Sequence, residues 1–160
     1  GSGSGGGGGG GVRLEMECTA RVPRVVCDKA RVMRSVLNVL TNAVKFCGQG
    51  RIRVEASVEE GREQQAGIGP VGDSDCRDPH RCCWRHPRFC AESDDLVLRV
   101  SVADTGRGMS ADALRACVRP FVRTRVENAQ GTGLGLHITL AHVLAHRGAL
   151  EIESEKGAGT

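Results

Sequence analysis

The apolar residues of this chain change their spacing along the sequence, and this change limits the folds available to it. Around residues 12–17, 52–58 and 96–102, apolar and polar residues alternate, which is typical of strands with one buried face. Between Asp28 and Gly48 the apolar residues recur at helical spacing, which predicts an amphipathic helix capped by Asp28. The stripe expected to be buried on this helix consists of Val32, Met33, Val36, Leu37, Leu40, Ala43 and Val44.

Weaker signals complete the order of the elements. Together they predict an α+β fold, a two-layer sandwich in which helices cover one face of a mixed β-sheet. The signals are Val25 and Val26 for a short strand, Ser110 and Pro120 for the ends of a short helix, glycines 131, 133 and 135 for the start of a last helix, Gly148 for its end, and Leu150 and Ile152 for a final strand.

Composition narrows the class of protein further. Residues 1–11 contain only glycine and serine and are expected to be a flexible tail, which leaves 12–160 as one domain. Aromatic residues make up 2% of the chain, so the core must be aliphatic and no platform for stacking nucleobases is available. A formal charge of +3 gives no support for a nucleic-acid partner. No apolar run approaches the ~20 residues of a membrane-spanning helix, so we expect no membrane contact by this part of the protein.

Residues 59–95 interrupt the pattern and are expected to be an inserted surface loop, because glycine, proline and charged residues replace any sustained apolar period. The insert is rich in metal-ligating residues, but their spacing matches no standard zinc motif, so we favour unliganded, disordered thiols and leave zinc open. These residues are Cys76, His80, Cys82, Cys83, His86 and Cys90. The other cysteines, Cys18, Cys27, Cys47 and Cys117, are expected to be buried thiols.

One face of the long predicted helix carries Asn38, Asn42 and Lys45, spaced by four and then three residues. Asparagine is a weak helix former, which suggests that these amides are needed for a function. An amide oxygen is a suitable single ligand for Mg²⁺, and a lysine can contact phosphate. A solvated helix face is the alternative explanation.

Two glycine-containing segments follow. Asp104, at the end of a predicted strand, shares a face with apolar residues, so its carboxylate needs a donor such as the exocyclic amine of adenine. A simple turn capped by Asp104 is the alternative. Residues 131–136 open a helix, where free amide groups and the helix dipole favour anions such as phosphate.

Taken in order, these segments resemble the ATP-binding domain that sensor histidine kinases share with gyrase-type topoisomerases and mismatch-repair ATPases (the GHKL or Bergerat fold), and the similarity to the histidine kinases is close. Residues 38–46 resemble the N box, 104–108 the first glycine box, 120–121 the F box, 131–136 the second glycine box and 157–160 the start of the last conserved turn. The family usually continues from this turn into another strand, so we expect that the C-terminal strand is truncated here.

The resemblance implies a site for ATP and Mg²⁺. It makes Asn42 the Mg²⁺ ligand, Asn38 an assisting catalytic residue, Lys45 a phosphate contact and Asp104 the adenine-binding acid. Residues 119–130 would form a lid, in which Arg123 and Arg125 are candidate phosphate contacts. The other residues implied in nucleotide binding are Gly106, Gly108, Phe121, Gly131, Thr132, Gly133, Leu134 and Gly135.

Asn38 also separates the branches of this superfamily, because the hydrolysing branches carry a proton-accepting glutamate there and an amide accepts no proton at neutral pH. We therefore expect transfer of the γ-phosphate to a histidine on a separate dimerisation domain, with a response-regulator receiver domain as the next acceptor. None of the five histidines here has the context of that acceptor.

We expect a cytoplasmic location and leave open whether the parent protein is membrane-anchored. The alternatives are a hydrolysing GHKL-type ATPase and a degenerate module that binds ATP only for regulation.

Overall fold

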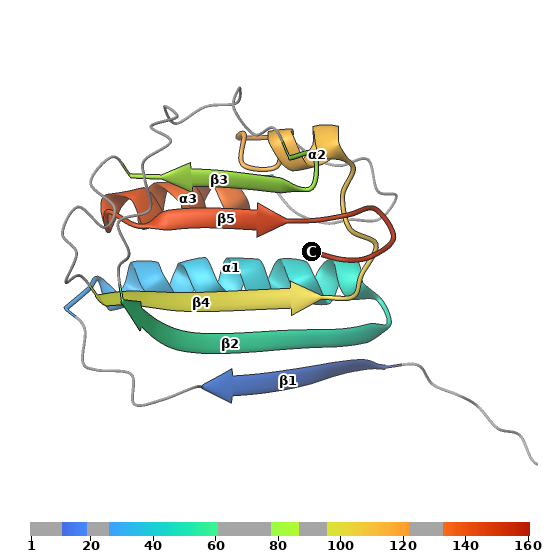
Figure 1. The fold of residues 1–160 in the computed structure, drawn as a ribbon, viewed down its shortest axis with the longest axis horizontal. Helices are drawn as coiled ribbons and strands as arrows, with labels where there is room; N and C mark the ends of the chain where they lie inside the picture. Colours follow the sequence, from blue (N-terminus) through green and yellow to red (C-terminus); the bar gives the residue numbers. More distant parts are fainter. Residues whose placement is uncertain (1–10, 19–25, 61–77, 87–95, 122–132) are drawn as a thin grey trace, which may run out of the picture.

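The structure, a computed structural model, describes residues 11–18, 26–60, 78–86, 96–121 and 133–160. Five strands form one layer and helices lie behind it (Figure 1), as the sequence predicts. In chain order the elements are β1 (Val12–Cys18), α1 (Lys29–Cys47), β2 (Gly50–Glu60), β3 (Arg81–Arg85), β4 (Leu96–Asp104), α2 (Ala111–Ala116), α3 (Gly135–Ala145) and β5 (Ala149–Glu153).

The strand layer consists of two sheets. In the first, β1 runs parallel to β2 and β2 antiparallel to β4, which gives the predicted mixed sheet. In the second, β3 and β5 are antiparallel. The two sheets are linked at one end, where the backbone N–H of Asp104 donates to the carbonyl of Thr160 at 2.8 Å and the N–H of Thr160 donates back at 3.2 Å.

Each sheet has its own buried cluster beneath a helix. The first consists of Ala43, Cys47 and Ile52, where α1 covers β2 and β4. The second joins β3, β5, α2 and α3 and is aliphatic except for one tryptophan and one thiol. Its members are Cys82, Trp84, Leu114, Val118, Leu140 and Ile152.

The long helix begins as predicted, with the Arg31 N–H donating to the Asp28 carboxylate at 3.1 Å. The predicted apolar stripe is too wide, because the side chains of Met33, Leu37 and Val44 are half exposed. On β1, Leu14 and Met16 are also exposed, at 52% and 77%. In Figure 1 α1 lies behind β4, and no helix of the described residues lies behind β1, which explains why this side stays open.

The expectation of a structureless loop over 59–95 is wrong for two parts of it. β2 extends to Glu60, and residues 81–85 form β3, which pairs with β5 along its whole length. Cys82 and Trp84 point into the core, while Arg81 lies on the opposite face and pairs with Glu151. Five residues of alternating pattern were too short a signal among the surrounding glycines and prolines.

Two smaller predictions also fail. Of the short strand predicted at Val25 and Val26, Val25 lies outside the described residues, and Val26 is fully exposed and not in a strand. Cys18 and Cys27 are exposed, not buried. The end of α3 agrees with the prediction: the helix stops three residues before Gly148, which donates its N–H to the Val143 carbonyl at 2.9 Å, and the left-handed backbone conformation falls on Arg147, with φ of 56°.

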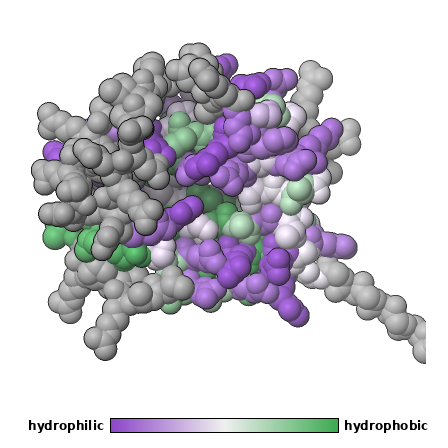
Figure 2. Space-filling model, in the orientation of Figure 1, coloured by the Kyte–Doolittle hydropathy of each residue, from purple (hydrophilic) through white to green (hydrophobic). Residues whose placement is uncertain are grey.

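The face of the strand layer turned away from the helices is polar. Arg53 pairs with Glu17 at 2.8 Å and with Glu55 at 2.7 Å, so charges alternate across β1 and β2. Figure 2 shows hydrophilic side chains over much of the described part of this face. None of the helices in the described part of the chain has the length and apolar character needed to cross a lipid bilayer.

Candidate functional site

Asp104 ends β4 on the side of the strand layer that faces the helices. It is directly opposite Ile52, which is fully buried under α1, so the two side chains share a face. Burial raises the pKa of the Asp104 carboxyl, and the Gly106 N–H, which donates to Oδ1 at 2.8 Å, partly offsets that rise. No donor from the described residues reaches the second oxygen, so the carboxylate can accept a further hydrogen bond from a ligand.

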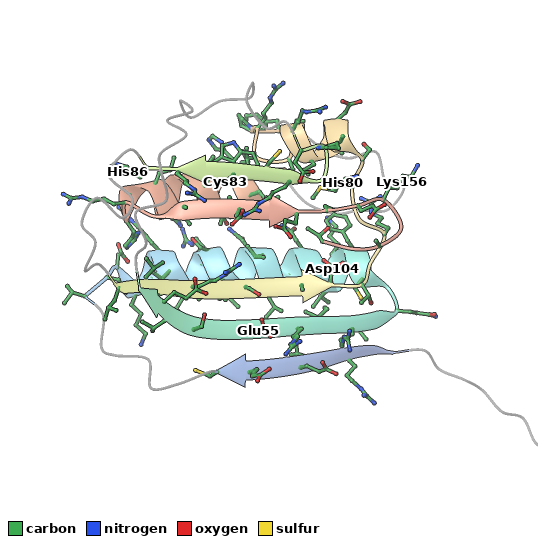
Figure 3. The ribbon with its side chains drawn as sticks, viewed as in Figure 1. Glu55, His80, Cys83, His86, Asp104 and Lys156 are labelled. Atoms are coloured by element: carbon green, nitrogen blue, oxygen red, sulfur yellow. The ribbon has the colours of Figure 1, made fainter. Side chains whose placement is uncertain are left out.

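The turn after Asp104 packs directly on the last turn of α1. A Cβ at position 106 would lie 2.5 Å from the Phe46 carbonyl oxygen and 2.8 Å from Cys47 Cα, so only glycine fits. The Arg107 N–H donates to the same Phe46 oxygen at 3.4 Å. This contact holds Asp104 beside the end of the helix that carries Asn42 and Lys45 (Figure 3).

The other side of α1 faces the start of α3. The Asn38 amide nitrogen donates to the Gly135 carbonyl at 3.3 Å and to Thr139 Oγ1 at 3.4 Å. Asn42 lies one turn further along the same side of α1 and is half buried. The structure therefore brings the segment 38–46 into contact with both glycine-containing segments.

Lys45 and Arg107 share one aromatic ring. Lys45 Nζ lies 5.2 Å from the centroid of the Phe46 ring, and Arg107 Cζ lies 4.7 Å from it. Both residues are exposed, whereas Phe46 is half buried. Sequence reasoning missed Arg107, although its signal was visible as a cation between the glycines of the first glycine box.

The first turn of α3 is also compatible with an anion. Leu134 is at the N-cap position and makes no side-chain cap, so the first backbone N–H groups of the helix have no partner from a capping side chain. Gly133 before it has φ of 72°, which favours glycine. Phe121 is 74% exposed. Gly131, Thr132, Arg123 and Arg125 lie outside the described residues.

A hollow of about 460 Å³ borders Asp104 on the side of the second sheet. Its walls come from the ends of β3 and β5 and from the C-terminal turn, including His80, Glu153 and Thr160. Asn38, Asn42 and Lys45 do not line this hollow. The proximity of Asp104 to these α1 residues therefore rests on the packing of the Gly106 turn.

The cysteines and histidines of the insert divide between core and surface. Cys82 is buried in the core, which overturns the expectation of disordered thiols for this residue. Cys83 is half buried, and its sulfur accepts from Arg85 Nε at 3.1 Å. No cluster of three metal-ligating side chains occurs within the described ranges, and Cys76 and Cys90 lie outside them.

The similarity to known proteins agrees with this geometry. The profile of the family described as histidine kinase-, DNA gyrase B- and HSP90-like ATPase matches residues 85–160. The chain is 30% identical over 144 residues to the non-motile and phage-resistance protein of Caulobacter vibrioides, covering 88% of this chain and 13% of that protein. It is 28% identical over 150 residues to the sensor histidine kinase ZraS of Escherichia coli, covering 93% of this chain and 24% of ZraS.

Two solved structures share the fold of this chain. Full-length ShkA, crystallised with AMPPNP, superimposes on this chain with a TM-score of 0.56 at 26% identity. The match covers 94% of this chain and 26% of ShkA. The mycobacterial sensor histidine kinase MprB shares the fold, with a TM-score of 0.52 at 21% identity over 91% of this chain. The chain thus spans about a quarter or less of the length of the first curated relatives and of ShkA.

Proposed function

Because the chain belongs to the histidine kinase-type ATP-binding family, as a catalytic ATP-binding domain of sensor histidine kinases, we propose that it presents Mg-ATP for phosphoryl transfer to a histidine on a separate domain. One observation supports this most directly: the Asp104 turn is packed on the last turn of α1. This packing sets a half-buried carboxylate beside the helix that carries two amides and a lysine.

The proposed roles follow from the chemistry of each group. The free oxygen of Asp104 accepts from the exocyclic amine of adenine, and the α3 N-terminus and Lys45 offset phosphate charge. Asn42 supplies an amide oxygen, which suits Mg²⁺ because this ion takes few protein ligands and keeps water and phosphate oxygens. Bound Mg²⁺ would neutralise charge on the phosphates.

Asn38 favours transfer over hydrolysis. Its amide bridges α1 and α3 and has no proton-accepting capacity at neutral pH, so no side chain at this position activates water. Catalysis then consists of holding the γ-phosphate in line while an external imidazole attacks it. The acceptor is proposed to be a histidine of a dimerisation domain, with a receiver domain downstream. Since ATP is the substrate, we also propose a cytoplasmic location.

The test is to mix the chain with a histidine kinase dimerisation domain and γ-labelled Mg-ATP. We expect acid-labile, base-stable phosphohistidine on the dimerisation domain and little free phosphate. Free phosphate without phosphohistidine would identify an ATPase, and nucleotide binding without either product would identify a regulatory module. The control is a dimerisation domain whose acceptor histidine is replaced by glutamine.

A further inference from the structure

We propose that Arg107 is a second phosphate-binding cation of the nucleotide site, held in position by Phe46 and acting beside Lys45. This inference rests on the proposed function and adds a residue to it. It concerns the residue between Gly106 and Gly108, to which the sequence analysis assigns no role.

The backbone of Arg107 is fixed on both sides. Its N–H donates to the Phe46 carbonyl at 3.4 Å, and its own carbonyl accepts from the Gly157 N–H at 2.7 Å. At the next residue, a Cβ on Gly108 would lie 1.8 Å from the Glu155 carbonyl oxygen, so the chain passes through a confined space here. The side chain therefore starts from a rigid point between α1 and the C-terminal turn.

The side chain of Arg107 lies against the Phe46 ring. Its guanidinium lies 4.7 Å from the centroid of the Phe46 ring, within the range of a cation–π contact. Lys45 Nζ lies 5.2 Å from the same centroid. The two cations are thus no more than about 10 Å apart, because both distances are measured to one point.

Two exposed cations at this separation are suited to a chain of phosphates. If Lys45 contacts one phosphate, the neighbouring phosphates of the same nucleotide lie within reach of Arg107. A guanidinium binds phosphate oxygens through two parallel N–H groups, which an ammonium cannot do. Stacking on Phe46 reduces the freedom that the arginine must lose on binding.

A purely structural role is the competing explanation, because cations near the C-terminus of α1 also interact favourably with the helix dipole. That role predicts a change in stability without a change in nucleotide affinity. A phosphate contact predicts a loss of affinity that depends on whether the ligand carries phosphates. The two can therefore be separated by comparing ATP with adenosine.

The experiment compares Arg107→Gln and Arg107→Lys with the wild-type chain by calorimetric titration with Mg-ATP and adenosine, and by thermal melting. We expect Arg107→Gln to weaken ATP binding by about tenfold or more while adenosine binding changes less than about twofold. Arg107→Lys should give an intermediate loss for ATP, because it keeps the charge and loses the paired donors. It also keeps a cation that can lie against the Phe46 ring, so a folded variant of the same charge is available.

The matched control is Arg99→Gln, which removes the same charge from β4 at an exposed arginine that pairs with Glu59. We expect this variant to bind ATP as the wild type does. Unchanged ATP affinity in a folded Arg107→Gln variant, or an equal loss for ATP and adenosine, would overturn the inference and leave the proposed function intact. Failure of the wild-type chain to bind ATP would overturn both.

Discussion

At the scale of single residues, Asp104 combines two opposed requirements. In its proposed role the carboxylate accepts from a purine amine, which its ionised form does best, yet burial raises the pKa of Asp104 and disfavours the charge. The Gly106 N–H at 2.8 Å is the only donor to it from the described part of the chain. Asp104 is therefore expected to lower the stability of the empty domain while providing its ligand specificity.

Asp104→Asn should separate these effects. The amide oxygen can still accept from Gly106, but the amide nitrogen cannot accept from adenine, so we expect ATP affinity to fall by about 10- to 100-fold. The variant should be at least as stable as the wild type at pH 7, because a partly buried charge is removed. Titration calorimetry and chemical denaturation measure the two quantities. Equal ATP affinities would contradict the assigned role.

The pH dependence of this stability difference has a definite sign. A carboxyl with a raised pKa in the folded state binds its proton more tightly there than in the unfolded chain. The folded state is therefore favoured at low pH and loses that advantage as pH rises through the raised pKa. The gain in stability from Asp104→Asn should thus be present at pH 7. It should shrink as the pH is lowered and disappear below the ordinary aspartate pKa, where the carboxyl is protonated in both states.

Gly106 and Gly135 lie in the two glycine boxes but differ in the space around them. Gly106→Ala would set a methyl group 2.5 Å from the Phe46 oxygen, so we expect a loss of about 1–3 kcal/mol in the free energy of unfolding, together with weaker ATP binding. At Gly135 the nearest atom to a Cβ is 3.7 Å away, so Gly135→Ala should be neutral or stabilise the helix by up to ~1 kcal/mol. Urea denaturation of both variants checks the contrast.

At the scale of elements, β3 is the strand that sequence reasoning did not find. It packs Cys82 and Trp84 into the second core cluster, where Trp84 is 7% exposed. Its partner β5 lies more than sixty residues away along the chain. Burial of this tryptophan makes part of the insert a structural component of the domain.

Trp84→Ala should therefore lower the free energy of unfolding by about 3–5 kcal/mol, through lost burial and the cavity left behind. Leu37→Gln is the matched control on α1, since Leu37 belongs to the predicted stripe but is 52% exposed. We expect this variant to stay within ~0.5 kcal/mol of the wild type. A small effect of Trp84→Ala would show that β3 is not part of the core.

At the scale of the whole molecule, two buried clusters are joined by the packing of α1 on α3 and by the C-terminal turn. Asn38 connects α1 to α3, and Thr160 connects the end of β4 to the C-terminal turn. The proposed nucleotide would contact Asp104 and α1 on one side and the start of α3 on the other. Binding should therefore couple the two halves.

Mg-ATP at a hundred times its Kd should stabilise the folded chain by about 2.7 kcal/mol, which corresponds to a rise in Tm of roughly 5–10 °C. Differential scanning calorimetry would detect this rise as a single shifted transition. Asp104→Asn under the same ligand concentration should show a smaller shift. An unchanged Tm of the wild-type chain would argue against a nucleotide site.

The sequence by itself determined most of the helices and strands, although not β3, together with the Asp28 and Ser110 caps and the contact of residues 38–46 with the two glycine-containing segments, because spacing and capping are local properties of the chain. Tertiary structure decided which faces are covered. Leu37 and Val32 belong to the same predicted stripe, yet the flank with Leu37 has no covering element among the described residues. Likewise, only the packing of the Gly106 turn on α1 brings Arg107 onto Phe46. Such contacts join residues far apart in the sequence, and no local period encodes them.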